Sequence, residues 1–250
     1  MAGNAGPGKV YLIGAGPGAA DLITVRGARL LSQADAVLHD ALVTPDLLAL
    51  CPQAELIAVG KRSGQRSTAQ TLINELLVDA AHRHRLVVRL KGGDPMLFGR
   101  ADEELRALEQ AGIPYEIVPG ITAALAAAAS ARQPLTRRGI ARSVALFTSA
   151  TAPGEPDQVT LPDCDTLVQY MGGREAMVTA RKLLERGQPG DTPVVVVENC
   201  SLANEHVLRL RLDDLEQGLA RCSGPVLVMI GAALAAREHG EAARPDAGGS

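Results

Sequence analysis

The chain has 250 residues, of which 46% are hydrophobic, 21% are charged and 2% are aromatic, and its formal net charge is −3. This apolar content is too high for a disordered chain, and it predicts aliphatic cores for one large domain or two smaller ones. The slightly acidic balance excludes a general basic surface for nucleic acids, although clustered arginines could still bind an acidic small molecule.

The cysteines are typical of a cytoplasmic protein. The four cysteines lie far apart in the sequence, which predicts free thiols in a reducing compartment. No apolar run has the length of a membrane span, and no Cys/His cluster has the spacing of a metal site. We expect residues 1–8 and 239–250 to be flexible tails, and we expect no metal.

Short apolar runs alternate with helical periodicity in the first half of the chain. The runs predict buried strands at residues 10–13, 36–39, 56–59, 86–90 and 115–118. The periodicity predicts helices at residues 24–34, 67–82, 101–111 and 122–131, with Ser67 as the N-cap of the second. Because the strands are continuously apolar and alternate with helices, we predict a largely parallel sheet covered on both faces.

A second series of elements begins after residue 139. Strands are predicted at residues 143–147, 166–171, 194–198, 207–210 and 226–230, and helices at residues 174–186 and 213–221. Residues 150–162 contain three prolines and no periodicity, which predicts a loop. The predicted fold class is therefore α/β, with an N-terminal domain at residues 9–138, a C-terminal domain at residues 139–238 and a cleft between them.

Glycine-rich turns follow four of the strands predicted in the first half, at residues 14–18, 60, 92–93 and 120. Ligands of parallel α/β sheets bind at the carboxyl ends of the strands, so we expect a ligand site there. The first turn fits the glycine pattern of dinucleotide folds, but Pro17 removes a backbone N–H that a pyrophosphate would need. From this pattern alone, a plain turn and a ligand loop explain the glycines equally well.

Polar side chains accompany these turns. Asp94 could accept hydrogen bonds from ribose hydroxyls or an amino group, and Thr122 could add a hydroxyl to the free N–H groups of a helix start. Asp40 and Lys61 follow neighbouring strands and could act as base and acid. A structural explanation remains open for each: a turn, a helix cap and a surface salt bridge.

Taken together, these segments resemble the tetrapyrrole methylase family. The resemblance covers about residues 9–238, with seven blocks in the family's order: residues 10–18, 39–43, 59–62, 87–100, 118–123, 134–136 and 170–172. It is closest to the members that methylate uroporphyrinogen III, and it implies a tetrapyrrole methylase-like pair of α/β domains and a homodimer.

The resemblance also implies the cofactor and the residues of the site. S-adenosyl-L-methionine would bind in the cleft and leave as S-adenosyl-L-homocysteine, while Asp40 would be the proton acceptor and Lys61 the proton donor. The residues implied to contact the methyl donor are Pro17, Gly92, Gly93, Asp94, Leu97, Thr122, Ala123, Met171 and Cys200.

The implied reaction converts uroporphyrinogen III, through precorrin-1, to precorrin-2 by methylation at carbons 2 and 7. Methyl transfer from a sulfonium to an electron-rich carbon depends on near-attack geometry and requires no metal. The substrate carries many carboxylates, which guanidinium groups bind in a two-pronged manner. We predict that arginines in loops near the cleft bind these carboxylates: Arg62, Arg66, Arg100, Arg137 and Arg138.

Three other functions fit part of the sequence. A related methylase of corrin synthesis would act on a later precorrin, although the blocks at residues 59–62 and 87–100 favour uroporphyrinogen III. An NAD(P)-dependent oxidoreductase would place an acid about 20 residues after the glycines, and Asp40 lies somewhat beyond that position. A non-enzymatic sensor would bind S-adenosyl-L-methionine without turnover.

Overall fold

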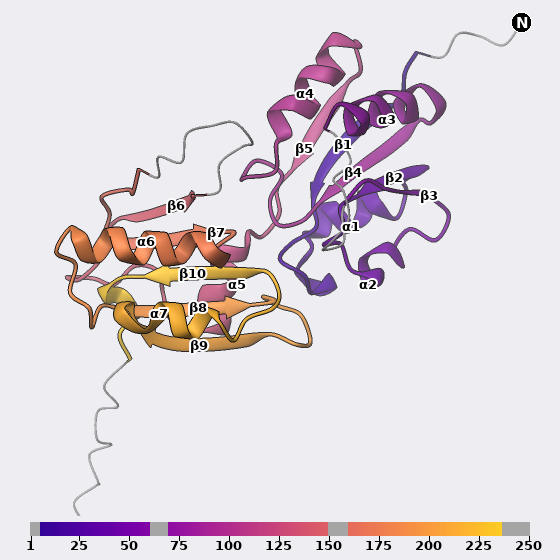
Figure 1. Cartoon of the computed structure of the whole chain (residues 1–250). Coiled ribbons are helices and arrows are strands. Elements are labelled where there is room, and N and C mark those ends of the chain that lie inside the picture. Colours follow the sequence, from indigo (N-terminus) through magenta and orange to yellow (C-terminus); the bar gives the residue numbers. More distant parts are fainter. Residues whose placement is uncertain (1–5, 61–69, 150–159, 237–250) are drawn as a thin grey trace, which may run out of the picture. The chain divides into compact units, whose positions relative to one another are not determined.

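The computed structural model describes residues 6–60, 70–149 and 160–236, except for the side chain of Arg174. The chain divides into two compact units, each of which contains one sheet (Figure 1). The first unit is formed by the described residues up to Arg132 together with Val197–Val207, and the second by the remaining ones. Both sheets fall within the domains predicted from the sequence at residues 9–138 and 139–238, but the unit bounds differ, because Val197–Val207 belongs to the first unit and the second begins at Gln133.

The first sheet has five strands in the order β3-β2-β4-β1-β5. Their bounds are Lys9–Gly14 for β1, Ala36–His39 for β2, Glu55–Ala58 for β3, Leu86–Lys91 for β4 and Tyr115–Val118 for β5. All of the pairings are parallel, which confirms the predicted parallel sheet. Leu90 lies opposite both Ile13 and His39, so the strands β1, β2 and β4 end at the same edge.

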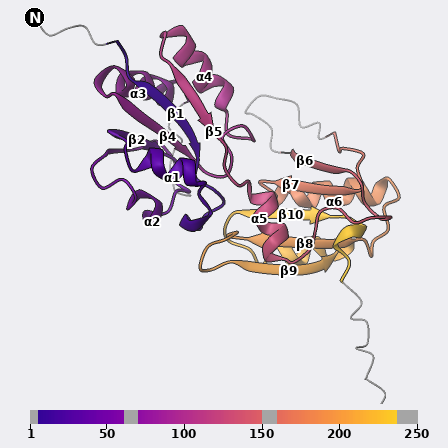
Figure 2. The ribbon, with the colours of Figure 1, turned by 180° about the vertical axis from the view of Figure 1, so that it is seen from behind.

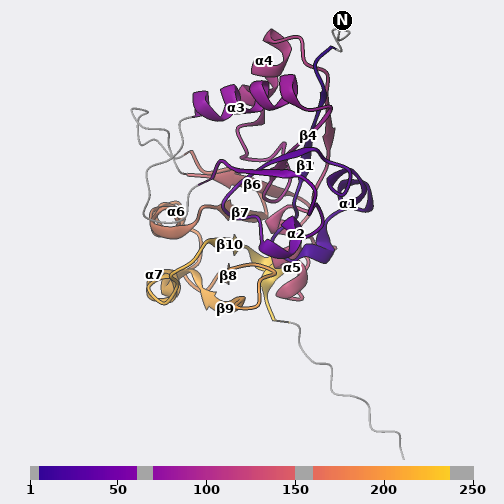
Figure 3. The same ribbon diagram turned by 90° about the vertical axis from the view of Figure 1, so that its right-hand side faces the viewer.

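Helices cover both faces of this sheet because successive residues of a strand point to opposite sides. Leu77 and Leu108 pack with Leu12 on one face, whereas Leu31 packs with Ile13 on the other. Figure 3 shows the corresponding helices on either side of β1 and β4. The helices of the first unit are α1 (Val25–Leu31), α2 (Pro45–Leu48), α3 (Gln70–Arg83), α4 (Ala101–Gln110) and α5 (Ala123–Ser130).

The second sheet is mixed and has the order β6-β7-β10-β8-β9. Strands β6 and β7 are parallel, whereas β7 and β10 are antiparallel. Leu183 and Leu215 of the flanking helices pack with Val196 and Val228 in one core. Figures 1 and 2 show both of these helices on one face of the sheet. The elements are β6 (Val144–Thr148), β7 (Thr166–Tyr170), α6 (Gly173–Glu185), β8 (Pro193–Glu198), β9 (His206–Arg211), α7 (Leu215–Leu219) and β10 (Val226–Ile230).

Some local features differ from the sequence prediction. Helix α2 was not predicted; Pro45 begins it after an extended Thr44, a common arrangement at the first helical position. Short 3-10 helices at Ala20–Leu22 and Ala232–Leu234 were not predicted either, and a third, Leu212–Asp214, forms the start of the helix predicted at residues 213–221. The proposed cap Ser67 and most of the predicted loop at residues 150–162 lie outside the described residues.

Two predictions about the whole chain can be compared with the structure. The four cysteines are free thiols, as expected from their spacing. Within the described parts of the chain, no helix combines the length and the apolar character that crossing a membrane requires.

Candidate functional site

Glycine bends from three strands lie against one another at the carboxyl edge of the first sheet. The N–H of Gly93 donates to the Gly16 carbonyl at 2.7 Å, and the N–H of Gly16 donates to the Gly93 carbonyl at 3.2 Å. A Cβ atom added to Gly14 would lie 2.5 Å from the Gly120 Cα, and one added to Gly120 would lie 2.2 Å from the Gly93 oxygen. The bends after β1, β4 and β5 therefore pack backbone against backbone, as parallel strands with common ends would allow.

The carboxylate of Asp94 connects two of these bends. Its Oδ1 accepts a hydrogen bond from the N–H of Met96 at 2.9 Å, and its Oδ2 accepts one from the N–H of Gly120 at 2.9 Å. Asp94 thus fixes its own turn, as the structural explanation from the sequence allowed, and also the bend after β5, which sequence reasoning did not assign. Each carboxylate oxygen can accept more than one hydrogen bond, so the same group can still bind a ligand.

Gly92 leaves space beside the bends that a side chain would fill. Among the described residues, an added Cβ would meet only Leu42, whose own Cβ would be 3.6 Å away. Gly93 differs because its φ of +68° is a conformation that favours glycine. Thr122 is the N-cap of α5, but its hydroxyl makes no capping hydrogen bond. A surface of backbone and small residues of this kind suits close approach by a ligand such as the predicted S-adenosyl group.

The segment Val197–Val207 brings further predicted donor contacts into the first unit. Ser201 Oγ accepts a hydrogen bond from the N–H of Ala19, just after Pro17, and Cys200 Sγ lies 3.9 Å from the Ala123 carbonyl oxygen. The predicted contacts Cys200 and Ala123 therefore lie together in this unit, and Ser201 joins the same segment to Ala19, two residues after Pro17.

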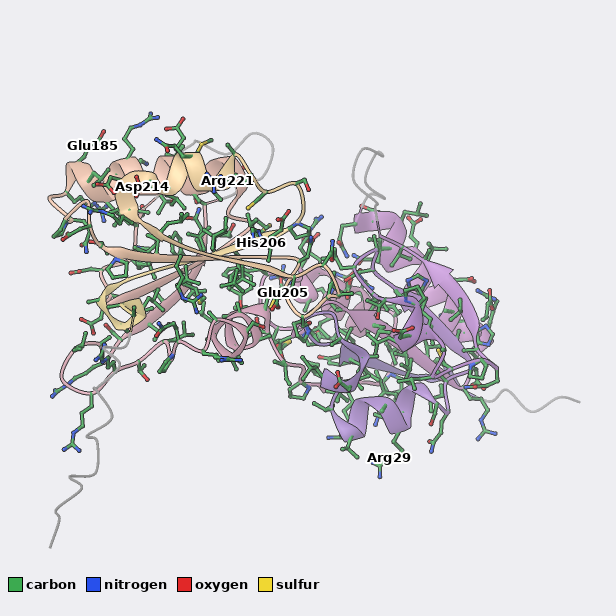
Figure 4. All side chains as sticks on the ribbon, turned by 90° about the horizontal axis from the view of Figure 1, so that it is seen from below. Arg29, Glu185, Glu205, His206, Asp214 and Arg221 are labelled. Atoms are coloured by element: carbon green, nitrogen blue, oxygen red, sulfur yellow. The ribbon has the colours of Figure 1, made fainter. Side chains whose placement is uncertain are left out.

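Glu205 anchors this segment (Figure 4). Its Oε2 accepts hydrogen bonds from the N–H of Ser201 at 2.6 Å and from Ser130 Oγ, at the end of α5, at 2.9 Å. Burial, followed by the Glu205 carboxylate as the second cause, raises the pKa of the Cys200 thiol to about 12. Cys200 is therefore a neutral thiol, not a nucleophile, at physiological pH.

Asp40 follows β2 and is paired with a buried arginine that the sequence analysis did not identify. Arg89 Nη2 lies 2.6 Å from Asp40 Oδ1, and Arg89 Nε lies 3.0 Å from Glu104 Oε1. Lys91 Nζ binds the same carboxylate of Glu104 at 3.0 and 3.1 Å. Asp40 is thus linked to a buried network, and Gln70 Nε2 adds a hydrogen bond to Glu104 at 3.3 Å. The surface salt bridge considered between Asp40 and Lys61 is not tested, because Lys61 lies outside the described residues.

The burial of this network is almost complete. The side chains of Arg89, Lys91 and Glu104 are 2%, 3% and 0% exposed, compared with 31% for Asp40. Burial, followed by the charge of Arg89, lowers the pKa of the Lys91 ammonium. One signal could have revealed the network: two basic residues interrupt the otherwise apolar run of β4 and share one face of the strand.

The remaining predicted residues do not all belong to the glycine bends. Lys61, Arg62 and Arg66 lie outside the described residues. Arg100, at the N-cap of α4, forms a two-pronged pair with Glu103 at 2.7 and 2.8 Å. Leu97 donates its N–H to the Asp94 carbonyl within the same turn as the donor contacts. The other predicted residues, Arg137, Arg138 and Met171, belong to the second unit, and their part in the site stays a prediction.

Comparison with known proteins identifies the family. The family profile described as Tetrapyrrole (Corrin/Porphyrin) Methylases matches residues 9–216. The chain belongs to the tetrapyrrole methylases. This confirms the resemblance drawn from the seven sequence blocks, which include the glycine bends described above.

Individual tetrapyrrole methylases are similar over most of this chain. A curated uroporphyrinogen-III C-methyltransferase of Pseudomonas aeruginosa is 44% identical over 228 residues, which cover 90% of this chain and 93% of that protein. A siroheme synthase of Pseudomonas fluorescens is 43% identical over 238 residues, and the match covers 93% of this chain but 51% of that protein. The chain thus spans about half the length of the siroheme synthases it matches.

A solved structure supports the α/β fold of this tetrapyrrole methylase. Uroporphyrin-III C-methyltransferase from Thermus thermophilus, in complex with S-adenosylhomocysteine, is 38% identical, and the match has a TM-score of 0.78 and covers 91% of this chain and 99% of that one. The strand order also contradicts a Rossmann oxidoreductase, because β4 lies between β1 and β2, which are neighbours in the Rossmann sheet.

Proposed function

We propose that this chain is a uroporphyrinogen-III C-methyltransferase that uses S-adenosyl-L-methionine to methylate carbons 2 and 7 of uroporphyrinogen III, through precorrin-1, to precorrin-2. The observation that carries the proposal is the junction of three glycine bends beside Asp40, at the edge where α/β sheets bind ligands. The curated methyltransferase with 93% of its length matched supports the same substrate.

The chain's own residues fit the methyl donor. The open backbone at Gly92 allows close approach, and Asp94 retains lone pairs for hydroxyl or amino donors. When bound, S-adenosyl-L-methionine supplies an electrophilic methyl group on a sulfonium. The residues proposed to hold it are Pro17, Gly92, Gly93, Asp94, Leu97, Thr122, Ala123, Met171 and Cys200.

Proton balance gives Asp40 its role. A ring carbon of the macrocycle uses a π-electron pair to form the new carbon–carbon bond, the sulfur–methyl bond breaks, and S-adenosyl-L-homocysteine leaves as a neutral thioether. One proton must leave the macrocycle for each methyl group gained. We assign Asp40 as the acceptor of that proton, because its carboxylate is partly exposed beside the bends. Lys61 is proposed as the proton donor.

Arginines are proposed to bind the carboxylates of the substrate. The Arg100 guanidinium is paired with Glu103. A substrate carboxylate that binds Arg100 would therefore have to replace the Glu103 carboxylate. The other arginines of the proposal are Arg62, Arg66, Arg137 and Arg138. We further propose that the enzyme is a cytoplasmic homodimer.

Anaerobic incubation of the purified chain with both substrates tests the proposal. We expect precorrin-2 and two molecules of S-adenosyl-L-homocysteine for each uroporphyrinogen III consumed. The Asp40→Asn variant should lose activity by about 10²- to 10⁴-fold, while its calorimetric affinity for S-adenosyl-L-homocysteine stays the same. Asp46→Asn, which changes an exposed acid of α2, is the matched control.

Two results would overturn the proposed function. If S-adenosyl-L-homocysteine did not bind, the glycine bends would not be a donor site. If the donor bound but only a later precorrin became methylated, the chain would instead be a related methylase of corrin synthesis.

A further inference from the structure

Four ionisable side chains form a continuous series of contacts near the carboxyl edge of the first sheet. Lys91 and Arg89 come from β4, Glu104 comes from α4, and Asp40 follows β2. The order of contacts is Lys91 to Glu104, Glu104 to Arg89, and Arg89 to Asp40. The series contains two carboxylates and two cations, so its formal charges cancel when all four groups are ionised.

Stability alone does not explain why these charges are buried. Removing charged groups from water is unfavourable, and apolar replacements of buried ion networks are often neutral or stabilising. Arg89 occupies a strand position whose neighbours, Val88 and Leu90, are fully buried aliphatic residues. An apolar residue at position 89 would therefore continue the pattern of the strand, which points to a role for the charge itself.

The geometry shows what Arg89 fixes. Its Nε binds Glu104, its Nη1 donates to the Leu38 and Leu90 carbonyls at 3.5 and 3.3 Å, and its Nη2 binds Asp40 Oδ1. These partners leave the planar guanidinium one orientation. Within residues 6–60, 70–149 and 160–236, Oδ2 of Asp40 receives no hydrogen bond. Arg89 therefore holds one carboxylate oxygen and leaves the other available.

We propose that Arg89, fixed in turn by Glu104, is a positioning residue that directs Oδ2 of Asp40 toward the proton removed from the macrocycle. This inference rests on the proposed function, because it assumes that Asp40 accepts that proton. Glu104 acts through Arg89 and does not reach the reacting atoms. Lys91 compensates the charge of Glu104, so that its carboxylate can orient Arg89 without leaving a buried negative charge.

Arg89→Met tests the proposal because it removes the guanidinium and leaves Lys91 and Glu104 as a neutral pair. We expect kcat to fall by about 10- to 100-fold, the usual effect of a misplaced catalytic group. The KM for both substrates and the calorimetric affinity for S-adenosyl-L-homocysteine should stay within threefold of the wild type. Arg83→Met, which removes a surface arginine paired with Asp79 and Glu55, is the matched control and should leave kcat unchanged.

A double-mutant cycle shows whether Arg89 acts through Asp40. If it does, Arg89→Met should cause no further loss in the Asp40→Asn background. Losses that multiply would overturn the proposal, and so would a kcat close to that of Arg83→Met or a KM and affinity that change as much as kcat. If Arg89→Met does not fold, Arg89→Lys keeps the charge but not the planar fork: a lower kcat with unchanged affinity supports the proposal, and wild-type kcat overturns it.

The measured activities distinguish a wrong proposed function from a wrong role for Arg89. If the wild type does not methylate uroporphyrinogen III, the proposed function is wrong and the role of Arg89 falls with it. If the wild type is active and Arg89→Met is equally active, only the positioning role is wrong.

Discussion

The backbone contacts between the glycine bends make Gly120→Ala a sensitive substitution. The added Cβ would lie 2.2 Å from the Gly93 oxygen and 2.7 Å from the Gly14 Cα. Ordinary carbon–oxygen contacts are about 3.3–3.6 Å, so the bends after β4 and β5 would have to separate by about 1 Å. Both neighbours are backbone atoms of strand ends, which cannot change rotamer to relieve the overlap.

The expected cost follows from this overlap. Overpacking a filled interior destabilises a protein by about 1–3 kcal/mol, and each kcal/mol lowers the melting temperature of a chain of this size by about 2–4 °C. We therefore expect the unfolding transition of the first unit to move down by about 2–12 °C. Because the bends carry the proposed donor site, the affinity for S-adenosyl-L-homocysteine should fall as well, by about 10-fold or more.

Gly173→Ala is the matched control for this substitution. A Cβ on Gly173 would meet only the Glu175 carboxylate, at 3.7 Å, among the described residues. The position is the first residue of α6, where alanine should be neutral or stabilise the protein by up to about 1 kcal/mol. Calorimetric melting and titration of both variants would refute the reasoning if Gly120→Ala matched Gly173→Ala in both measurements.

Three further substitutions or reactions test other parts of the structure. Glu104→Leu leaves two buried cations without their carboxylate, so the free energy of unfolding in urea should fall by about 3–5 kcal/mol. Hydrogen bonds from the Arg142 backbone and from Ser143 hold the pKa of Asp165 below its usual range. The stabilisation from Asp165 is therefore present above its unfolded pKa and is lost as pH falls through its folded pKa. Asp165→Asn should make the melting temperature depend less on pH at the acid end. The pKa of about 12 for Cys200 predicts much slower alkylation by iodoacetamide at about pH 8 than for free cysteine, as measured by mass spectrometry.

Each of these expectations has a result that contradicts it. For Glu104→Leu, it is a loss no greater than that of Glu109→Leu, which changes an exposed residue of the same helix. For Asp165→Asn, it is an acid limb parallel to that of the wild type. For Cys200, it is alkylation at the rate of free cysteine.

The first sheet was predictable because local signals and topology agree. Continuous apolar runs such as residues 86–90 end in glycine, and helices separate most of them, which leaves parallel pairing as the simple arrangement. Helix α2 was missed because its four residues are too few to show periodicity. The antiparallel pairing of β7 with β10 depends on contacts between segments more than 50 residues apart, and no local pattern contains that information.

The candidate site was likewise predictable from the sequence only in part. The edge position of the glycine bends and Asp40 follows from where the strands end, and the sequence alone therefore predicts it. The partner of Asp40 depends on which way Arg89 points and on a carboxylate supplied by α4, 15 residues further along the chain. Two charges within an apolar strand indicate that a buried partner must exist, but they do not identify Glu104.

Strand β4 links the two parts of the proposed chemistry. Its alternate residues Arg89 and Lys91 face the same side and hold Asp40 through the buried network, and the chain then continues directly into Gly92 and Gly93. Successive residues of a strand advance by about 3.3 Å, so the arginine that positions the proton acceptor and the bend that approaches the donor are separated by a fixed length of one rigid element. In the proposed reaction, methyl transfer and proton removal both act on one macrocycle, and a common strand would keep their spacing constant without requiring a loop to become ordered.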